Sequence, residues 1–238
     1  MVTQAAPHPP VHGVPLVEVG ALTRERLLDT AERLFAERGF AATSVRDITA
    51  AAGCNLAAVN YHFGGKSNLY REAFLRGLTV LREQRLAALR EIMGRRPAPG
   101  VAEVLRVFAT AFVAPLHESR GPLLFRLWTR ELLDPKLPPE TFAAEMIMPI
   151  RRALLGALRS LEPSLAERDA VLCIQSFVAQ LSNVFHLQRF AQSAAIGPGA
   201  FTPAEHVRHI VAFSVAGIRA AAGASRGGRR SPHKEVSS

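Results

Sequence analysis

Residues between Ser44 and Phe63 have the types and the spacing that contact with a nucleic acid requires. Asn60 carries an amide that can bond to the edge of a base, while Tyr61 and His62 carry groups that can bond to phosphate oxygens. The alanines before them are small enough to allow close approach to a base pair, and their methyl groups can contact thymine. The chemistry predicted here is non-covalent recognition of a duplex.

Two short helices must hold these side chains in place. The first is expected to begin at Ser44, where Asp47 completes a capping box, and to end at Gly53, where a glycine tolerates the positive φ of a tight turn. The second is expected over 55–63 with Asn55 as its N-cap. Two such helices joined by a tight turn are typical of the helix-turn-helix, whose second helix enters the DNA major groove. Spacing alone leaves an ordinary small helical hairpin open as the alternative.

The rest of the chain also has helical periodicity, without strand alternation or internal repeats. Pro149 should kink or split the helix in which it lies. Further capping boxes are predicted at Ser164 with Glu167 and at Thr202 with Glu205. The other helices are expected over 23–38, 66–92, 101–118, 122–133, 139–161, 164–191 and 203–222.

The composition bounds the class of protein. Hydrophobic residues make up 48% of the 238 residues, which excludes wholesale disorder, and the two cysteines cannot form a disulfide framework and favour a reducing compartment. No apolar run approaches the length of about 18 residues that a membrane span needs, and the Pro-rich start does not have the pattern of a signal peptide. A cytoplasmic protein without a membrane partner is therefore expected. The net charge of +9 suits a polyanionic partner, although a solvated basic surface explains it equally well.

No residue set predicts catalysis, a metal site or a cofactor. The stretch 65–67 imitates the end of a phosphate-binding loop, but Asn60 stands where that motif needs glycine. Acidic residues are scattered, so no carboxylate pair can be nominated for acid–base work, and an enzyme is not expected. The histidine pairs, which lack further metal ligands, are His8 with His12 and His206 with His209.

The run from Ser44 to Lys66 resembles the TetR family of bacterial transcriptional regulators, and the residues from Leu34 to Phe40 match as well. The resemblance covers about residues 23–75. It implies a three-helix N-terminal DNA-binding domain followed by a larger helical domain for ligand binding and dimerisation. Asn60 stands where the family more often has tyrosine, so the resemblance does not imply the operator sequence.

The resemblance also implies which residues contact DNA. Thr43 and Ser44 match positions that hold phosphates, a role that suits hydroxyls at a helix N-terminus. Arg46 matches a position that reaches a base or the backbone. The remaining predicted contacts are Asn55 at the start of the second helix, Leu56, Ala57, Ala58 and Asn60 toward the groove, and Tyr61, His62 and Lys66 on phosphates.

Helices 164–191 and 203–222 are apolar nearly all round. A helix of this kind must be buried on every side, and two of them at the end of a chain need more cover than one small domain supplies. We therefore expect a homodimer joined by a four-helix bundle, with two helices from each subunit. Cover by other helices of the same chain is the alternative.

The C-terminal half is also expected to bind an unidentified small-molecule effector. Pockets are mostly apolar with a few polar groups. Helix 122–133 carries spaced aromatic residues, and helix 164–191 combines an aromatic residue with amides. Core packing explains the aromatic residues equally well. The candidate pocket residues are Phe125, Trp128, Phe177, Gln180 and Asn183.

These features predict an all-α protein with a helix-turn-helix domain and a larger helical ligand-binding and dimerisation domain. The expected function is a repressor that binds a near-palindromic double-stranded DNA operator as a dimer and is released by a small molecule. An activator or a ligand-independent regulator with the same DNA-binding heads is the alternative. The expected divisions are a flexible arm over 1–22, the DNA-binding domain over 23–70 with its motif at 44–63, the second domain over 71–222 and a disordered basic tail over 223–238.

Overall fold

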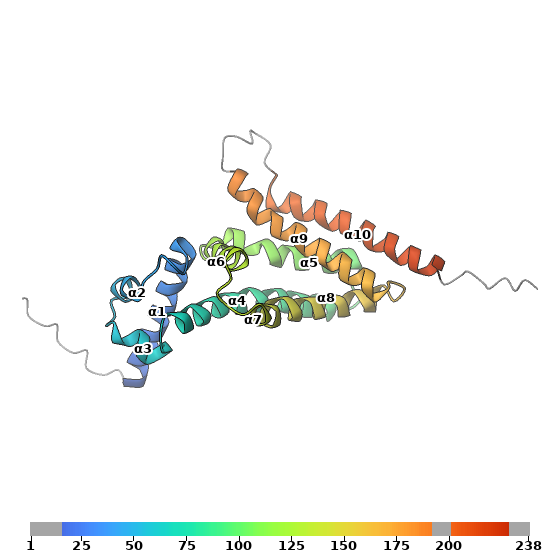
Figure 1. The fold of residues 1–238 in the computed structure, drawn as a ribbon. Helices are drawn as coiled ribbons and strands as arrows, with labels where there is room; N and C mark the ends of the chain where they lie inside the picture. Colours follow the sequence, from blue (N-terminus) through green and yellow to red (C-terminus); the bar gives the residue numbers. More distant parts are fainter. Residues whose placement is uncertain (1–15, 192–200, 229–238) are drawn as a thin grey trace, which may run out of the picture. The chain divides into compact units, whose positions relative to one another are not determined.

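The computed structural model describes residues 16–191 and 201–228, with side chains described for 20–187 and 201–224. Within these ranges every regular element is a helix (Figure 1), which confirms the all-α fold class. The helices form two compact units. The first unit ends at Phe74, four residues after the boundary that is predicted from the sequence at residue 70.

The first unit contains α1 (Leu16–Arg38), α2 (Val45–Ala52), α3 (Ala57–Phe63) and the beginning of α4 (Lys66–Met93). The predicted apolar stripe of α1 is confirmed, because its members are at most 2% exposed. The prediction that this helix begins near residue 23 is wrong: it begins at Leu16, so residues 16–22 are not part of a flexible arm. The rest of the predicted arm, 1–15, lies outside the described residues. The stripe consists of Leu27, Ala31, Leu34 and Phe35.

The predicted capping box at the start of α2 is present. The Ser44 hydroxyl accepts a hydrogen bond from the Asp47 N–H at 3.1 Å, and the Asp47 carboxylate accepts one from the Ser44 N–H at 2.9 Å. Hydrogen bonds from the Ser44 side chain and backbone lower the pKa of the Asp47 carboxyl group, because they stabilise its charged form. The cap therefore fixes where α2 begins.

Gly53 ends α2 in the left-handed conformation, with φ of +61°, as the sequence predicts. A Cβ atom there would lie 2.8 Å from the Arg26 guanidinium, which itself donates to the Ala52 carbonyl. The positive φ favours glycine at this turn, while the guanidinium, at the end of a flexible side chain, could move aside. The turn leads into α3, which begins at Ala57 rather than at residue 55, and the Asn55 side chain accepts a hydrogen bond from the Ala57 N–H at 3.0 Å.

The second unit begins within α4, at Leu75, and contains the helices from α5 (Val101–Val113) to α10 (Pro203–Gly228). Helices α9 (Glu167–Ala191) and α10 run side by side, α5 packs against both, and α8 (Met148–Leu161) packs against α9 (Figure 1). Phe108 on α5 and Phe177 on α9 lie at the centre of the core, with ring centroids 5.9 Å apart. The elements between α5 and α8 are η1 (Ala114–His117), α6 (Gly121–Leu133), α7 (Pro139–Phe142) and η2 (Ala143–Ile147).

Pro149 splits the helix predicted over 139–161, as expected. A proline has no N–H to donate and its ring crowds the preceding turn, so the regular α-helical ladder cannot pass through it. The chain widens into the π-helical segment η2 just before Pro149, which then lies in the first turn of α8. Glu145 of η2 contacts Arg82 on α4.

One of the two other capping boxes is confirmed and one is wrong. The Thr202 hydroxyl accepts from the Glu205 N–H at 3.2 Å and the Glu205 carboxylate accepts from the Thr202 N–H at 2.8 Å, which lowers the pKa of Glu205. By contrast, the Ser164 hydroxyl is buried and has no hydrogen-bond partner among the described residues, because α9 begins later, at Glu167. Helix α10 continues to Gly228, so 223–228 are helical rather than part of a disordered tail, and 229–238 lie outside the described residues.

Within the described part of the chain, the stretch Glu167–Leu187 of α9 is long and apolar enough to cross a membrane. It is a core helix of the second unit. Its buried side, formed by Ala170, Ile174, Phe177 and Leu181, is at most 4% exposed and faces α5, α8 and α10.

Candidate nucleic-acid interface

Helix α3 has one buried side and one exposed side. Val59 and Phe63, four residues apart, are 0% and 4% exposed and pack into the first unit. The opposite side therefore faces outward, and Tyr61 is 85% exposed. An aromatic side chain that is left so open suits a macromolecular contact. The other exposed members of the predicted contact set on this segment are Asn55, Leu56, Ala57 and Asn60, while Ala58 and His62 are partly exposed.

Predicted contact residues on either side of α3 in the chain are also accessible. Ser44 and Arg46 at the beginning of α2 are exposed. Lys66, the first residue of α4, is partly exposed and its amine lies 4.2 Å from the centroid of the Phe40 ring. Partial burial lowers the pKa of this amine. The stacking on Phe40 holds the cation in a fixed position, which suits contact with a phosphate.

Thr43, which is also predicted to contact DNA, differs from these residues because its side chain is buried. Its side chain is 0% exposed, and its hydroxyl donates to the carbonyl oxygens of Gly39 at 2.8 Å and Leu34 at 3.2 Å. Thr43 instead joins the end of α1 to the start of α2. A sequence pattern places a hydroxyl at this point but does not indicate whether the side chain points into the core or toward solvent.

Two arginines of α1 hold the helix-turn-helix in place, and no motif in the sequence indicates either of them. Arg24 forms an ion pair with Glu72 on α4, and its guanidinium lies 5.3 Å from the centroid of the Phe63 ring. Arg26 donates to the backbone at the end of α2. These partners lie 26 to 48 positions away in the chain, so no local spacing could have indicated them.

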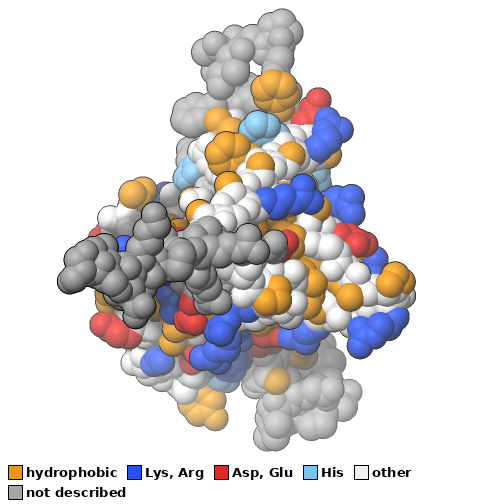
Figure 2. Space-filling model, turned by 90° about the vertical axis from the view of Figure 1, so that its right-hand side faces the viewer, with side chains coloured by type: hydrophobic (Ala, Val, Ile, Leu, Met, Phe, Trp, Pro, Cys, Tyr) orange, Lys and Arg blue, Asp and Glu red, His pale blue; other side chains and the backbone are white. Residues whose placement is uncertain are grey.

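The net charge does not by itself locate the interface. On the one face that Figure 2 draws, Lys and Arg side chains are dispersed among acidic and apolar ones. The case for α3 depends on its exposed side chains and on the burial of Val59 and Phe63.

The predicted pocket residues of the second unit have different surroundings. A cavity of about 390 Å³ is lined by Trp128 together with residues of α4, α5, α8, α9 and the η2 region. Phe125 packs against Trp128, with ring centroids 5.3 Å apart, but does not line the cavity. Phe177 lies in the core at 1% exposure, and neither Gln180 nor Asn183 lines the cavity. Of the five candidates, only Trp128 therefore faces this space.

Comparison with known proteins places both parts of the chain. Residues 27–73 match the profile of bacterial regulatory proteins of the tetR family, and residues 101–218 match the C-terminal domain of the HTH-type transcriptional dual regulator CecR. An uncharacterized HTH-type transcriptional regulator, MT1294 of Mycobacterium tuberculosis, is 31% identical over 149 residues, which cover 63% of this chain and 69% of that protein.

Solved structures share the fold. A putative transcriptional regulator from Pseudomonas aeruginosa PAO1 is 27% identical with a TM-score of 0.65, covering 86% of this chain and 92% of that one. A putative transcriptional regulator from Saccharomonospora viridis, solved in complex with choline, is 18% identical with a TM-score of 0.62, covering 81% and 95%.

Three further curated relatives match over shorter stretches than MT1294, and the chain spans 47%, 23% and 26% of their lengths. They are all regulators of the helix-turn-helix type, which agrees with the prediction that the chain is not an enzyme. With both of its units accounted for by regulator domains, the chain belongs to the TetR family of transcriptional regulators, and α2 and α3 form its helix-turn-helix.

Proposed function

We propose that the protein is a cytoplasmic repressor that binds a near-palindromic operator as a homodimer and leaves it when a small molecule binds the second unit. The observation that carries this proposal is the outward face of α3, where Asn60 and Tyr61 are exposed while Val59 and Phe63 are locked in the core. A short helix held in this way can enter a major groove about 12 Å wide. The residues proposed to contact DNA are Ser44, Arg46, Asn55, Leu56, Ala57, Ala58, Asn60, Tyr61, His62 and Lys66.

The outer sides of α9 and α10 support the homodimer. Leu172 on α9 is 53% exposed and Phe213 on α10 is 62% exposed, although both helices pack against the core on their inner sides. Small residues on the outer side of α10 would let a second helix approach closely. A second copy of the chain would cover these surfaces, so that α9 and α10 of both subunits form a four-helix bundle. The two α3 helices of the dimer would then meet half-sites about one DNA turn apart. The small exposed residues are Ala212, Ala216, Gly217 and Ala220.

Exchange of Phe213 for glutamate is expected to convert the dimer to a monomer, because two like charges would be buried at the subunit contact. Light scattering at micromolar concentration measures the change. Leu133→Glu is the matched control, since Leu133 is 82% exposed but lies on α6. A wild-type protein that is a stable monomer at this concentration would contradict the proposed assembly.

Release by a small molecule requires that the molecule bind one conformation of the dimer more tightly than another. The choline complex of the structural relative supports a small-molecule site within this fold. In the proposed mechanism, the ligand favours a dimer whose two α3 helices no longer match the spacing of the half-sites.

The repressor role is tested by deleting the gene and following a reporter driven by a DNA fragment that the protein binds. Repression predicts that reporter output rises on deletion. A fall in output would instead identify an activator. Output that rises on deletion but responds to no small molecule in the intact strain would identify a ligand-independent regulator.

A further inference from the structure

Arg85 on α4 is a buried cation without an anionic partner. Its side chain is 4% exposed, and its guanidinium carbon lies 3.8 Å from the centroid of the Phe112 ring. The buried Nε atom has no hydrogen-bond partner, and none of the described residues forms an ion pair with Arg85. A buried charge is costly unless it is paired, so such a residue needs an explanation.

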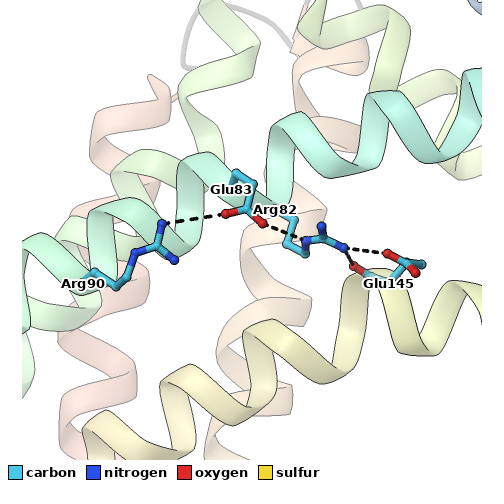
Figure 3. A network of polar contacts seen from close by, with 4 residues as sticks. All are labelled: Arg82, Glu83, Arg90 and Glu145. Atoms are coloured by element: carbon cyan, nitrogen blue, oxygen red, sulfur yellow. Dashed lines mark hydrogen bonds and ion pairs between the residues drawn. The ribbon is translucent and has the colours of Figure 1, made fainter.

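Arg82, one turn earlier on α4, shows how this helix satisfies an arginine. Its guanidinium donates to the Glu145 backbone oxygen at 2.6 Å and carboxylate at 2.8 Å, and to Glu83 at 3.2 Å (Figure 3). Burial acts to lower the pKa of Arg82, but the hydrogen bonds and charges of Glu145 and Glu83 raise it. For Arg85, burial acts alone and lowers the pKa to about 9. Glu145, the acidic residue of η2, is thus already engaged by Arg82.

The cavity of about 390 Å³ in the second unit lies beside Arg85, which is one of its lining residues. A second polar group without a partner lines the same space, because the indole N–H of Trp128 is buried and donates to no described residue. The other walls are largely apolar and include Ile150, Ile174 and Val178. The cavity therefore combines largely apolar walls with two buried donors that have no partner, on Arg85 and Trp128, and its lining also includes Arg151 and Gln175.

The position of the Phe112 ring determines what the Arg85 guanidinium can still bind. A ring stacked on the face of a guanidinium leaves the N–H groups in its plane available. Those groups form a fork that matches the two oxygens of a carboxylate. A cation would be repelled by Arg85, and a neutral ligand would leave its charge unpaired.

We propose that this cavity binds an amphipathic organic carboxylate, with Arg85 holding the carboxylate and the apolar walls holding its hydrocarbon part. This inference rests on the proposed function, since it names the class of effector that the second unit accepts. In this proposal the unpartnered indole N–H of Trp128 donates a further hydrogen bond to the acid group or to a polar atom next to it.

The test uses decanoate as the probe on the purified full-length chain. Trp128 is the only tryptophan in the sequence and lines the cavity, so its fluorescence reports occupancy of this site. Decanoate is expected to change the fluorescence saturably. Decanol and decyltrimethylammonium, which have the same chain length, are expected to bind about 10- to 100-fold more weakly, the range for lost hydrogen bonds to a charged group.

Arg85→Met should bind decanoate and decanol with equal affinity, while the matched variant Arg90→Met should behave as wild type, because Arg90 is an exposed arginine of the same helix. Removal of an unpaired buried charge should leave the protein folded, and circular dichroism checks this. If Arg85→Met does not fold, the affinities of the wild-type protein for decanoate and decanol still test the proposal. The proposal is overturned if decanol binds wild type as tightly as decanoate, if folded Arg85→Met keeps the preference for the acid, or if neither decanoate nor 4-phenylbutanoate changes the fluorescence.

Failure of the proposed function is visible separately, as lack of DNA binding in the same preparation without any probe. Decanoate that binds through Arg85 and also releases DNA supports both the site and the release mechanism. If decanoate binds through Arg85 but does not release DNA, the carboxylate site is supported. The same result counts against the idea that a ligand in this site releases the protein from DNA.

Discussion

Replacement of Ala57 by glutamate is expected to abolish DNA binding while the fold remains intact. Ala57 is the first residue of α3 and is exposed on the face opposite Val59 and Phe63. A glutamate there would place a negative charge and a longer side chain against the phosphates and bases of the groove. Like charges at an interface cost several kcal/mol, so affinity should fall by more than about 100-fold. Fluorescence anisotropy with a labelled DNA fragment measures the loss.

The control is Ala87→Glu, which makes the same change at an exposed position of α4 in the second unit. It should bind DNA as tightly as wild type, and circular dichroism should show that both variants retain their helices. If Ala57→Glu keeps wild-type affinity, α3 does not face the DNA and the described interface is wrong.

Replacement of Gly121 by alanine is expected to destabilise the second unit severely. A Cβ atom at Gly121 would lie 1.7 Å from the carbonyl oxygen of Pro115 and 2.4 Å from its carbonyl carbon. Both are backbone atoms of η1, so no side-chain rotation can relieve the clash. Overpacking of this kind costs about 3 kcal/mol or more when the backbone must move. Urea unfolding of the full chain, followed by circular dichroism, measures the change in the free energy of unfolding.

Gly156→Ala is the matched control, because nothing lies within 4 Å of a Cβ atom at that position in α8. Alanine is a better helix former than glycine, so this variant should be stabilised by up to about 1 kcal/mol. Equal stabilities for the two variants would show that η1 and the start of α6 are not packed as described.

The sequence predicts well those features of the fold that depend on interactions between residues close together in the chain. The capping box of Ser44 with Asp47, the glycine turn at Gly53 and the break at Pro149 each follow from interactions within a few positions of the chain. The Ser164 box failed although its pattern is the same, because the helix begins three residues later and leaves the hydroxyl buried without a partner.

Features that depend on distant contacts could not be predicted in this way. Thr43 has the residue type of a phosphate ligand, yet the end of α1 binds its hydroxyl. Aromatic spacing did not distinguish Trp128, which lines a cavity, from Phe177, which fills the core. Arg85 was missed altogether, since its importance comes from the partner that it lacks after folding and not from any motif around it.

Enrichment of fragments of the organism's own genome by the purified protein, at low ionic strength and with no small molecule present, tests most directly whether α3 reads DNA. A few fragments that share a near-palindrome are expected to be strongly enriched by wild type, to be lost with Ala57→Glu and to be bound less tightly as salt is raised. A protein that binds no fragment, or that binds every fragment equally, would contradict this expectation.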